Sequence, residues 1–231
     1  MSATEAAKFL GEAWETGHSL APFPEDLAPA DIAAGEAIAA ELVEALGLPV
    51  CGVRLAPGPD GLSMLSAPLL APRMLRVGTP VALSALRSPR ISAGFLGVLA
   101  EPFEAGEPVF SAYHPVLDIA ATRYTSGAAD AAHQVADLGG LGLVLVGKRW
   151  IGTLPEDGEA RIGLTGARPR PLRAPLANLM RQAGEEALRW GALPAGAVLV
   201  VAGLATGSPP VAGQKWAAAV SPVGRISAVL G

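Results

Sequence analysis

The spacing of apolar residues along the chain changes once, close to residue 49. Before that point apolar side chains recur every three or four positions, which predicts two amphipathic helices, over Thr4–Glu15 and Pro29–Leu46. Gly17 follows the first helix and Gly47 the second, and glycine is the usual residue just past a helix end. The N-terminal segment 1–48 is therefore expected to be helical.

After residue 49 the period falls to two and turn residues multiply, which predicts strands. The expected strands are Val50–Leu55, Arg90–Leu99, Val116–Ala120, Leu141–Gly147, Arg161–Thr165, Ala197–Leu204, Gln214–Val220 and Arg225–Leu230. The last two should form a hairpin through the turn residues 221–224, and one late helix is predicted over Pro175–Trp190. Helices followed by strands indicate an α+β fold around a mixed or antiparallel sheet, with residues 1–231 as a single domain.

Composition excludes several classes of protein. Lys and Arg number 17 against 21 Asp and Glu, a net charge of −4, which leaves no basic surplus for nucleic acid. Apolar residues make up 51% and charged residues 16%, which excludes disorder, while no apolar run is long enough for a membrane span. The single cysteine and the absence of a visible signal peptide favour a cytoplasmic protein, and the apolar excess favours an oligomer.

Familiar catalytic and metal-binding motifs are missing from the sequence. His18, His114 and His133 are scattered, and no pair of them has metal-ligand spacing. There is no G-x-S-x-G nucleophile turn and no H-E-x-x-H helix. A hydrolase triad, a zinc site and a dinucleotide fold are therefore not expected.

Read in blocks, the chain resembles the 2-keto-4-pentenoate hydratase / 4-oxalocrotonate decarboxylase family of the fumarylacetoacetate hydrolase-like superfamily. TGHSLAPFPEDLAPADIAAGEAIAAELV (17–43) is similar to the family's N-terminal helix segment, and VCGVRLAPG (50–58) to its G-y-K-iGlTs strand. SPRISAGFLGVLAEPF (88–103) is similar to prvEaEiaFvl, and YHPVLDIAATRY (113–124) to hpaiEivdsRy. The segment 176–231 resembles the closing helix, the GdvvltGsltG strand and the terminal hairpin.

The resemblance implies a mixed β-sheet roll with N-terminal helices and one late helix. It also implies lyase chemistry in which three carboxylates hold Mg²⁺, and the ion binds a small unsaturated 2-oxo acid. In this chain the two glutamates of the E-x-E pair are replaced by Ser92 and Gly94, and only the third acid remains, as Asp118. The family lysine is matched by Arg54. One carboxylate and a hydroxyl are a poor ligand set for Mg²⁺, so we expect no metal cofactor here.

The residues left at the family's site positions are the candidate site. We expect Arg54, Asp118 and His114 to be catalytic, and the substrate-binding candidates are Ser92, Arg123, Tyr124, Thr206 and Gly207. An arginine-lined site would attract a small carboxylate-bearing molecule. The structural alternative is that Asp118 merely forms an ion pair with Arg54 or Arg123.

Three functions remain open. The first is a hydratase- or decarboxylase-like lyase that acts on a small unsaturated 2-oxo acid or enol without the family metal. The second is a catalytically inactive homologue that serves as partner subunit or scaffold of an active family enzyme, in a homo- or hetero-oligomer. The third is a Mg²⁺-dependent hydratase whose ligands come from the acidic loop residues Glu101, Glu104 and Glu107.

Overall fold

The computed structural model describes residues 3–231 and confirms the α+β class. The α-helices of this part of the chain are α1 (Ala3–Thr16), α2 (Ile32–Leu46), α3 (Ala131–Ala136) and α4 (Leu176–Ala187). Short 3₁₀ turns cover Ala71–Arg73 (η1), Leu83–Ala85 (η2), Leu138–Gly140 (η3) and Leu188–Trp190 (η4).

The start of α2 differs from the prediction. The Asp31 side chain accepts a hydrogen bond from the backbone N–H of Ala34 at 2.8 Å, so Asp31 is the N-cap and the helix begins at Ile32 rather than Pro29. The end is as predicted, because Gly47 takes a left-handed conformation with φ of 60° and closes the helix.

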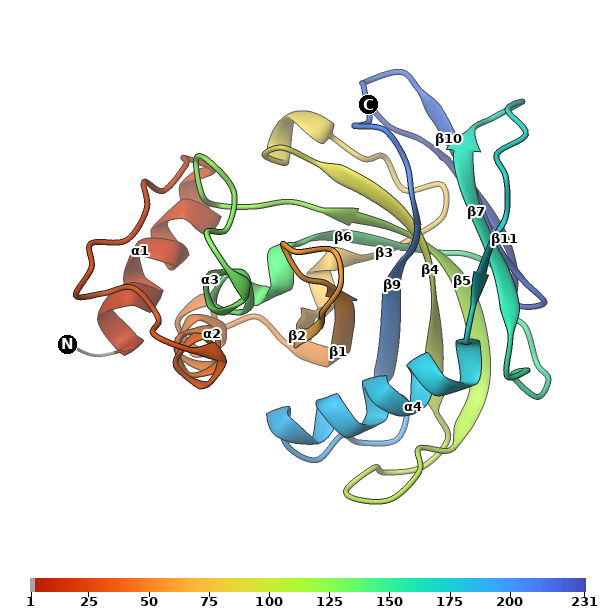
Figure 1. Cartoon of the computed structure of the whole chain (residues 1–231), viewed down its shortest axis with the longest axis horizontal. Coiled ribbons are helices and arrows are strands. Elements are labelled where there is room, and N and C mark those ends of the chain that lie inside the picture. The colour runs from red at the N-terminus through yellow and green to blue at the C-terminus, as the bar shows by residue number, and fades with distance from the viewer. Residues whose placement is uncertain (1–2) are drawn as a thin grey trace.

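Two sheets make up the rest of the molecule (Figure 1). The seven-stranded sheet has the order β2-β1-β9-β4-β5-β6-β3; its strands are β1 (Val50–Pro57), β2 (Met64–Leu70), β3 (Met74–Arg76), β4 (Arg90–Leu99), β5 (Phe110–Ala120), β6 (Leu141–Val146) and β9 (Val198–Thr206). Strands β1 and β9 run parallel, as do β3 and β6, and the other pairs are antiparallel. The sheet is therefore mixed, as expected.

The second sheet has the order β11-β10-β7-β8, with β7 (Gly158–Leu164), β8 (Leu172–Ala174), β10 (Lys215–Ser221) and β11 (Gly224–Val229). Strands β10 and β11 form the predicted hairpin. One apolar core, which includes Phe95, Leu117 and Trp216, lies between the two sheets. A second core, with Leu10, Leu42 and Val116, joins the opposite face of the large sheet to α1 and α2. Figure 1 shows this layering, with α1, α2 and α3 on one side of the large sheet and β7, β10 and β11 on the other.

Four elements escaped the sequence analysis. Strands β3 and β8 have three residues each and α3 has six, which is too short for a period to show. Strand β2 is almost fully buried and contains Pro68, so it shows neither alternation nor an uninterrupted strand pattern. Strand β5 begins at Phe110, six residues before the predicted start, and continues through Pro115.

None of the helices within residues 3–231 is long and apolar enough to cross a membrane.

Candidate functional site

Three of the predicted site residues meet on the helix-bearing face of the large sheet. Arg54 comes from β1, Ser92 from β4 and Asp118 from β5, where Ser92 and Asp118 are direct partners across the antiparallel pair. The Arg54 guanidinium donates two parallel hydrogen bonds to Asp118, from Nε to Oδ1 at 2.7 Å and from Nη2 to Oδ2 at 2.8 Å. This bidentate geometry is the strongest form of an arginine–carboxylate pair.

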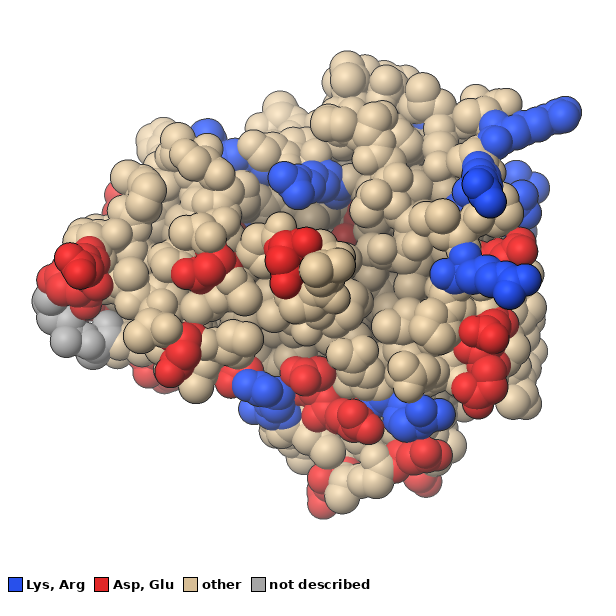
Figure 2. Space-filling view, in the orientation of Figure 1, with Lys and Arg blue, Asp and Glu red and all other residues tan. Residues whose placement is uncertain are grey.

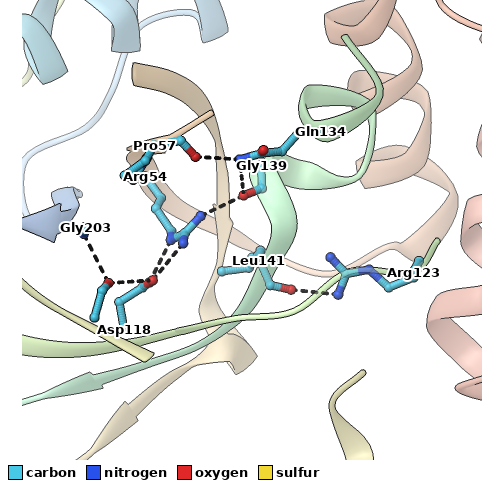
Figure 3. Close-up of polar contacts among 9 residues, drawn as sticks. Arg54, Pro57, Asp118, Arg123, Gln134, Gly139, Leu141 and Gly203 are labelled. Carbon is cyan, nitrogen blue, oxygen red and sulfur yellow. Dashed lines mark hydrogen bonds and ion pairs between the residues drawn. The ribbon is translucent and has the colours of Figure 1, made fainter. Parts of the chain in front are cut away.

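The hydrogen-bonding groups around this pair are satisfied from within the protein. The third Arg54 nitrogen, Nη1, donates to the Gly139 carbonyl at 2.9 Å. The Ser92 hydroxyl accepts the Gly203 backbone N–H at 3.1 Å and lies 3.4 Å from Asp118 Oδ2 (Figure 3). Arg54 and Asp118 are each 2% exposed. The arrangement is a closed, charge-balanced cluster.

The position of Gly94, which the resemblance aligns with the second glutamate of the E-x-E pair, has no space for a side chain. A Cβ atom built on Gly94 would lie 2.3 Å from the Val201 carbonyl oxygen and 3.1 Å from Ala202 Cα, both in the neighbouring strand β9. Atoms of a real side chain do not approach backbone so closely, so the present backbone accepts only glycine here. The β4–β9 register is also irregular between Ala93 and Phe95.

The residues of this site do not fit a divalent cation. Both Asp118 oxygens are already neutralised by Arg54, a positive charge that is part of the chain. Ser92 and Gly94 supply no carboxylate, and residues 3–231 contain no group of three Asp, Glu, His or Cys side chains that could hold a metal ion. The guanidinium takes over the charge that a cation would supply, so the donor set of this centre does not suit Mg²⁺.

Three other predicted site residues lie on β5, on β9 or just past the end of β9, without joining the cluster. His114 lies four residues from Asp118 on β5, about 13 Å along the strand, and its Nδ1 is 2.9 Å from the Gly147 carbonyl oxygen. Thr206 is opposite Ser92 in the β4–β9 register and is exposed. Gly207 donates its backbone N–H to the Ile91 carbonyl at 2.9 Å.

Arg123 and Tyr124 belong to a second buried cluster. Arg123 Nε donates to Asp137 Oδ1 at 2.5 Å, its Nη1 donates to the Leu141 carbonyl at 2.7 Å, and its backbone N–H donates to Asp137 Oδ2 at 2.9 Å. The Tyr124 hydroxyl donates to the His133 carbonyl at 3.2 Å, and burial raises the pKa of this phenol. Arg123 therefore pairs with Asp137 and leaves Asp118 to Arg54.

The acidic loop residues do not rebuild the metal site. Glu101, Glu104 and Glu107 lie exposed beyond the end of β4, and Ser92 is seven residues, about 23 Å, back along that strand from Leu99. Glu107 makes an exposed contact of 3.6 Å with Arg181.

Residues 137–141, which no pattern in the sequence singled out, support both clusters. The Asp137 carboxylate accepts from Arg123. The Gly139 carbonyl accepts from Arg54 and the Leu141 carbonyl from Arg123 (Figure 3). Gln134 of α3 also donates to the Pro57 carbonyl at 2.8 Å. The signal was the Gly139-Gly140 pair, since both residues take positive φ values, 64° and 68°.

Charged side chains on the surface are sparse and mixed. On the face drawn in Figure 2, basic side chains are interspersed with acidic ones, and large uncharged areas separate them. This agrees with the low charge content of the chain, 16%.

Several solved structures have the same fold as this chain. The chain superposes on 4-oxalocrotonate decarboxylase from Pseudomonas putida G7, complexed with magnesium and adipate, with a TM-score of 0.81, 17% identity, and coverage of 99% of this chain and 97% of the other. It also matches 2-hydroxyhepta-2,4-diene-1,7-dioate isomerase from Mycobacterium marinum (TM-score 0.58, 14% identity, 79% and 76% coverage). A third match is fumarylpyruvate hydrolase from Pseudomonas aeruginosa in complex with Mn²⁺ and pyruvate (TM-score 0.57, 12% identity, 80% and 91% coverage).

No protein-family model and no curated protein sequence matches the chain. The structural likeness confirms the fumarylacetoacetate hydrolase-like fold that the sequence blocks predicted. Proteins with this fold include a decarboxylase, an isomerase and a hydrolase, so the fold by itself does not select one reaction.

Proposed function

We propose that this chain is a non-catalytic protein on an enzyme fold, acting as partner subunit or scaffold for a homologous active enzyme. The observation that carries the proposal is the closed state of the centre where relatives would do chemistry. Both carboxylate oxygens of Asp118 accept hydrogen bonds from Arg54, and the backbone around Gly94 leaves no space for the side chain of a second acid.

An acid–base catalyst must reach the proton that it transfers, within hydrogen-bond distance or through one water. Asp118 is 2% exposed and already bound, and neither of two cavities found in residues 3–231 is lined by Arg54, Ser92 or Asp118. A substrate would have to break the ion pair, leaving a buried charge uncompensated at a cost of about 3–5 kcal/mol.

Apolar surface supports a role in an assembly. Leu62, Ile151 and Val211 are 89%, 70% and 59% exposed, in a chain with only 16% charged residues. Exposed apolar side chains of this size are available for subunit contacts, and they mark an interface where they form one contiguous patch.

The second candidate is a metal-independent lyase acting on a small unsaturated 2-oxo acid or enol. The convergence of Arg54, Asp118 and Ser92 favours it, since a guanidinium could bind the carboxylate of a substrate in place of Asp118. The decarboxylase and hydrolase structures hold adipate and pyruvate, which are small molecules that carry carboxylate groups. In this mechanism a released Asp118 would move the proton, because His114 lies too far along β5 to reach a substrate bound at Arg54.

Turnover assays separate the two candidates. The full chain would be assayed on small unsaturated 2-oxo acids, with and without Mg²⁺, beside Asp118→Asn and Asp137→Asn. We expect no turnover above the buffer rate in any sample. Turnover by the parent chain that falls at least 100-fold in Asp118→Asn and survives in Asp137→Asn would overturn the non-catalytic proposal. The matched control breaks the other buried pair, so it accounts for general damage to folding.

The partner role has its own test. Native mass spectrometry of the chain co-expressed with an active homologue from the same cell should show a mixed oligomer. Self-assembly alone would contradict the partner role.

A further inference from the structure

The second buried pair borders a cavity that the sequence analysis did not anticipate. The cavity has a volume of about 40 Å³ and lies where the end of α1 meets the segments before β4 and after β5. Its wall includes Arg73, Arg87 and Arg123, together with Thr122 and His18. None of its lining residues is Asp or Glu.

Positive charge at this cavity exceeds the local negative charge. The Asp137 carboxylate forms its ion pair with Arg123, and none of the ion pairs in residues 3–231 involves Arg73 or Arg87. Two of the guanidinium groups crowd onto one aromatic ring: Arg73 Cζ lies 4.4 Å and Arg123 Cζ 4.1 Å from the centre of the Trp14 ring. The ring face attracts both cations but carries no net charge to neutralise them.

Burial and the neighbouring charge of Arg123 both disfavour the charged form of Arg73. Burial lowers the pKa of its guanidinium, and the charge of Arg123 lowers that pKa further. Arginine keeps its proton at neutral pH, so the Arg73 guanidinium remains a cation and has no acidic side chain of residues 3–231 as its ion-pair partner. Arg123 uses three N–H groups on Asp137 and Leu141, which leaves two of its five donors free.

We propose that this cavity is a binding site for a phosphate group, either free or carried by a small metabolite. Guanidinium forks match phosphate oxygens in geometry, and a dianion would balance the two arginines that lack an acid. The volume is about that of three water-sized spheres, which suits one oxyanion head group and leaves the rest of a larger ligand outside. The site is separate from the Arg54–Asp118 cluster and does not depend on the proposed function.

Calorimetric titration of the full chain at low ionic strength tests this site, with inorganic phosphate as probe and acetate and chloride as parallel arms. We expect saturable phosphate binding, at least tenfold tighter than acetate, and none with chloride. Arg73→Gln should weaken phosphate binding at least tenfold, and Arg87→Gln, at an exposed position, at least threefold. Arg76→Gln is the matched control, because Arg76 is exposed three residues along the chain and does not line the cavity; it should change binding less than twofold.

Several results would overturn the site. They are the absence of saturable phosphate binding, acetate binding as tightly as phosphate, or an Arg76→Gln effect equal to that of Arg73→Gln. A fluorescence titration gives a second readout, since phosphate should alter the emission of the parent chain and not that of Trp14→Phe. A phosphate response that persists unchanged in Trp14→Phe would place the ion elsewhere.

Discussion

Two buried arginine–aspartate pairs share one supporting segment, residues 137–141, yet their surroundings differ. Around Arg54 and Asp118 the charges balance, and contacts at Gly94 and Gly203 close the space; a Cβ on Gly203 would lie 2.2 Å from Pro57 Cγ. Around Arg123 and Asp137 two further arginines face a cavity without an acid. The Arg54–Asp118 pair, whose charges balance and which has no space beside it, stabilises the fold. The Arg123–Asp137 pair lies beside a cavity with excess positive charge, which attracts an anionic ligand.

The difference departs from what the sequence resemblance implies. The positions that the resemblance assigns to a metal centre form a closed internal cluster, while Arg123, expected beside them, lies at the open cavity. Fold and site therefore carry separate information about function.

Removing Asp118 should give the largest effect on stability. Asp118→Ala leaves the Arg54 guanidinium buried and unpaired, so we expect the free energy of unfolding to fall by about 3–5 kcal/mol. The double variant Arg54→Leu/Asp118→Leu removes both charges and should recover most of that loss. Urea denaturation measures both. A loss below about 1 kcal/mol in Asp118→Ala would show that the pair does not hold the structure.

The lack of space at Gly94 is tested by substituting alanine, whose side chain is a single methyl group. Gly94→Ala forces a methyl group against the Val201 carbonyl, so strand β9 must shift at a cost of about 1–3 kcal/mol. Gly11→Ala is the control, because its Cβ would meet only Leu42 at 3.8 Å and alanine favours helix α1 by up to about 1 kcal/mol. Equal stability of the two variants would mean that the site has room to open.

Sequence alone predicted the main scaffold and part of the site. The long helices and strands carry clear periods, and the resemblance to the family grouped Ser92 with Asp118, which the structure shows as direct partners between β4 and β5. The structural alternative for Asp118, an ion pair with Arg54, was also available from the residues. Asp137 could not be predicted as the partner of Arg123, because η3 and α3 are too short to show a period and their position depends on tertiary packing.

Ligand additions should affect the two regions differently. Phosphate at ten times its dissociation constant adds about 1.4 kcal/mol to the stability of the native chain, which corresponds to a rise in Tm of about 3–5 °C. Mg²⁺ should leave Tm unchanged, since Asp118 is already neutralised. Differential scanning fluorimetry with Arg73→Gln shows whether the phosphate effect requires the cavity. A Mg²⁺ effect abolished by Glu101→Gln or Glu104→Gln would instead establish a metal site on the acidic loop.

The smallest effect is on how the free energy of unfolding changes with pH in alkaline solution. It tests how well the cluster around Arg123 and Asp137 is buried. Burial is the main cause that raises the pKa of Tyr124 in the folded chain, with the charge of Asp137 adding to it. Above pH 10 the unfolded tyrosine loses its proton while the folded one keeps it, so the stability of the parent chain falls as pH rises, by up to about 1.4 kcal/mol per pH unit from this group.

Tyr124→Phe removes this dependence together with the hydrogen bond to His133, worth about 1 kcal/mol at neutral pH. The variant should therefore be less stable than the parent at pH 7 and should approach or exceed it by pH 11. Tyr113 is present in both proteins, so the raised pKa that burial gives it cancels in the comparison. Urea denaturation at the two pH values gives the difference, and a constant gap would mean that the Tyr124 hydroxyl reaches solvent and that the second cluster is more open than its packing indicates.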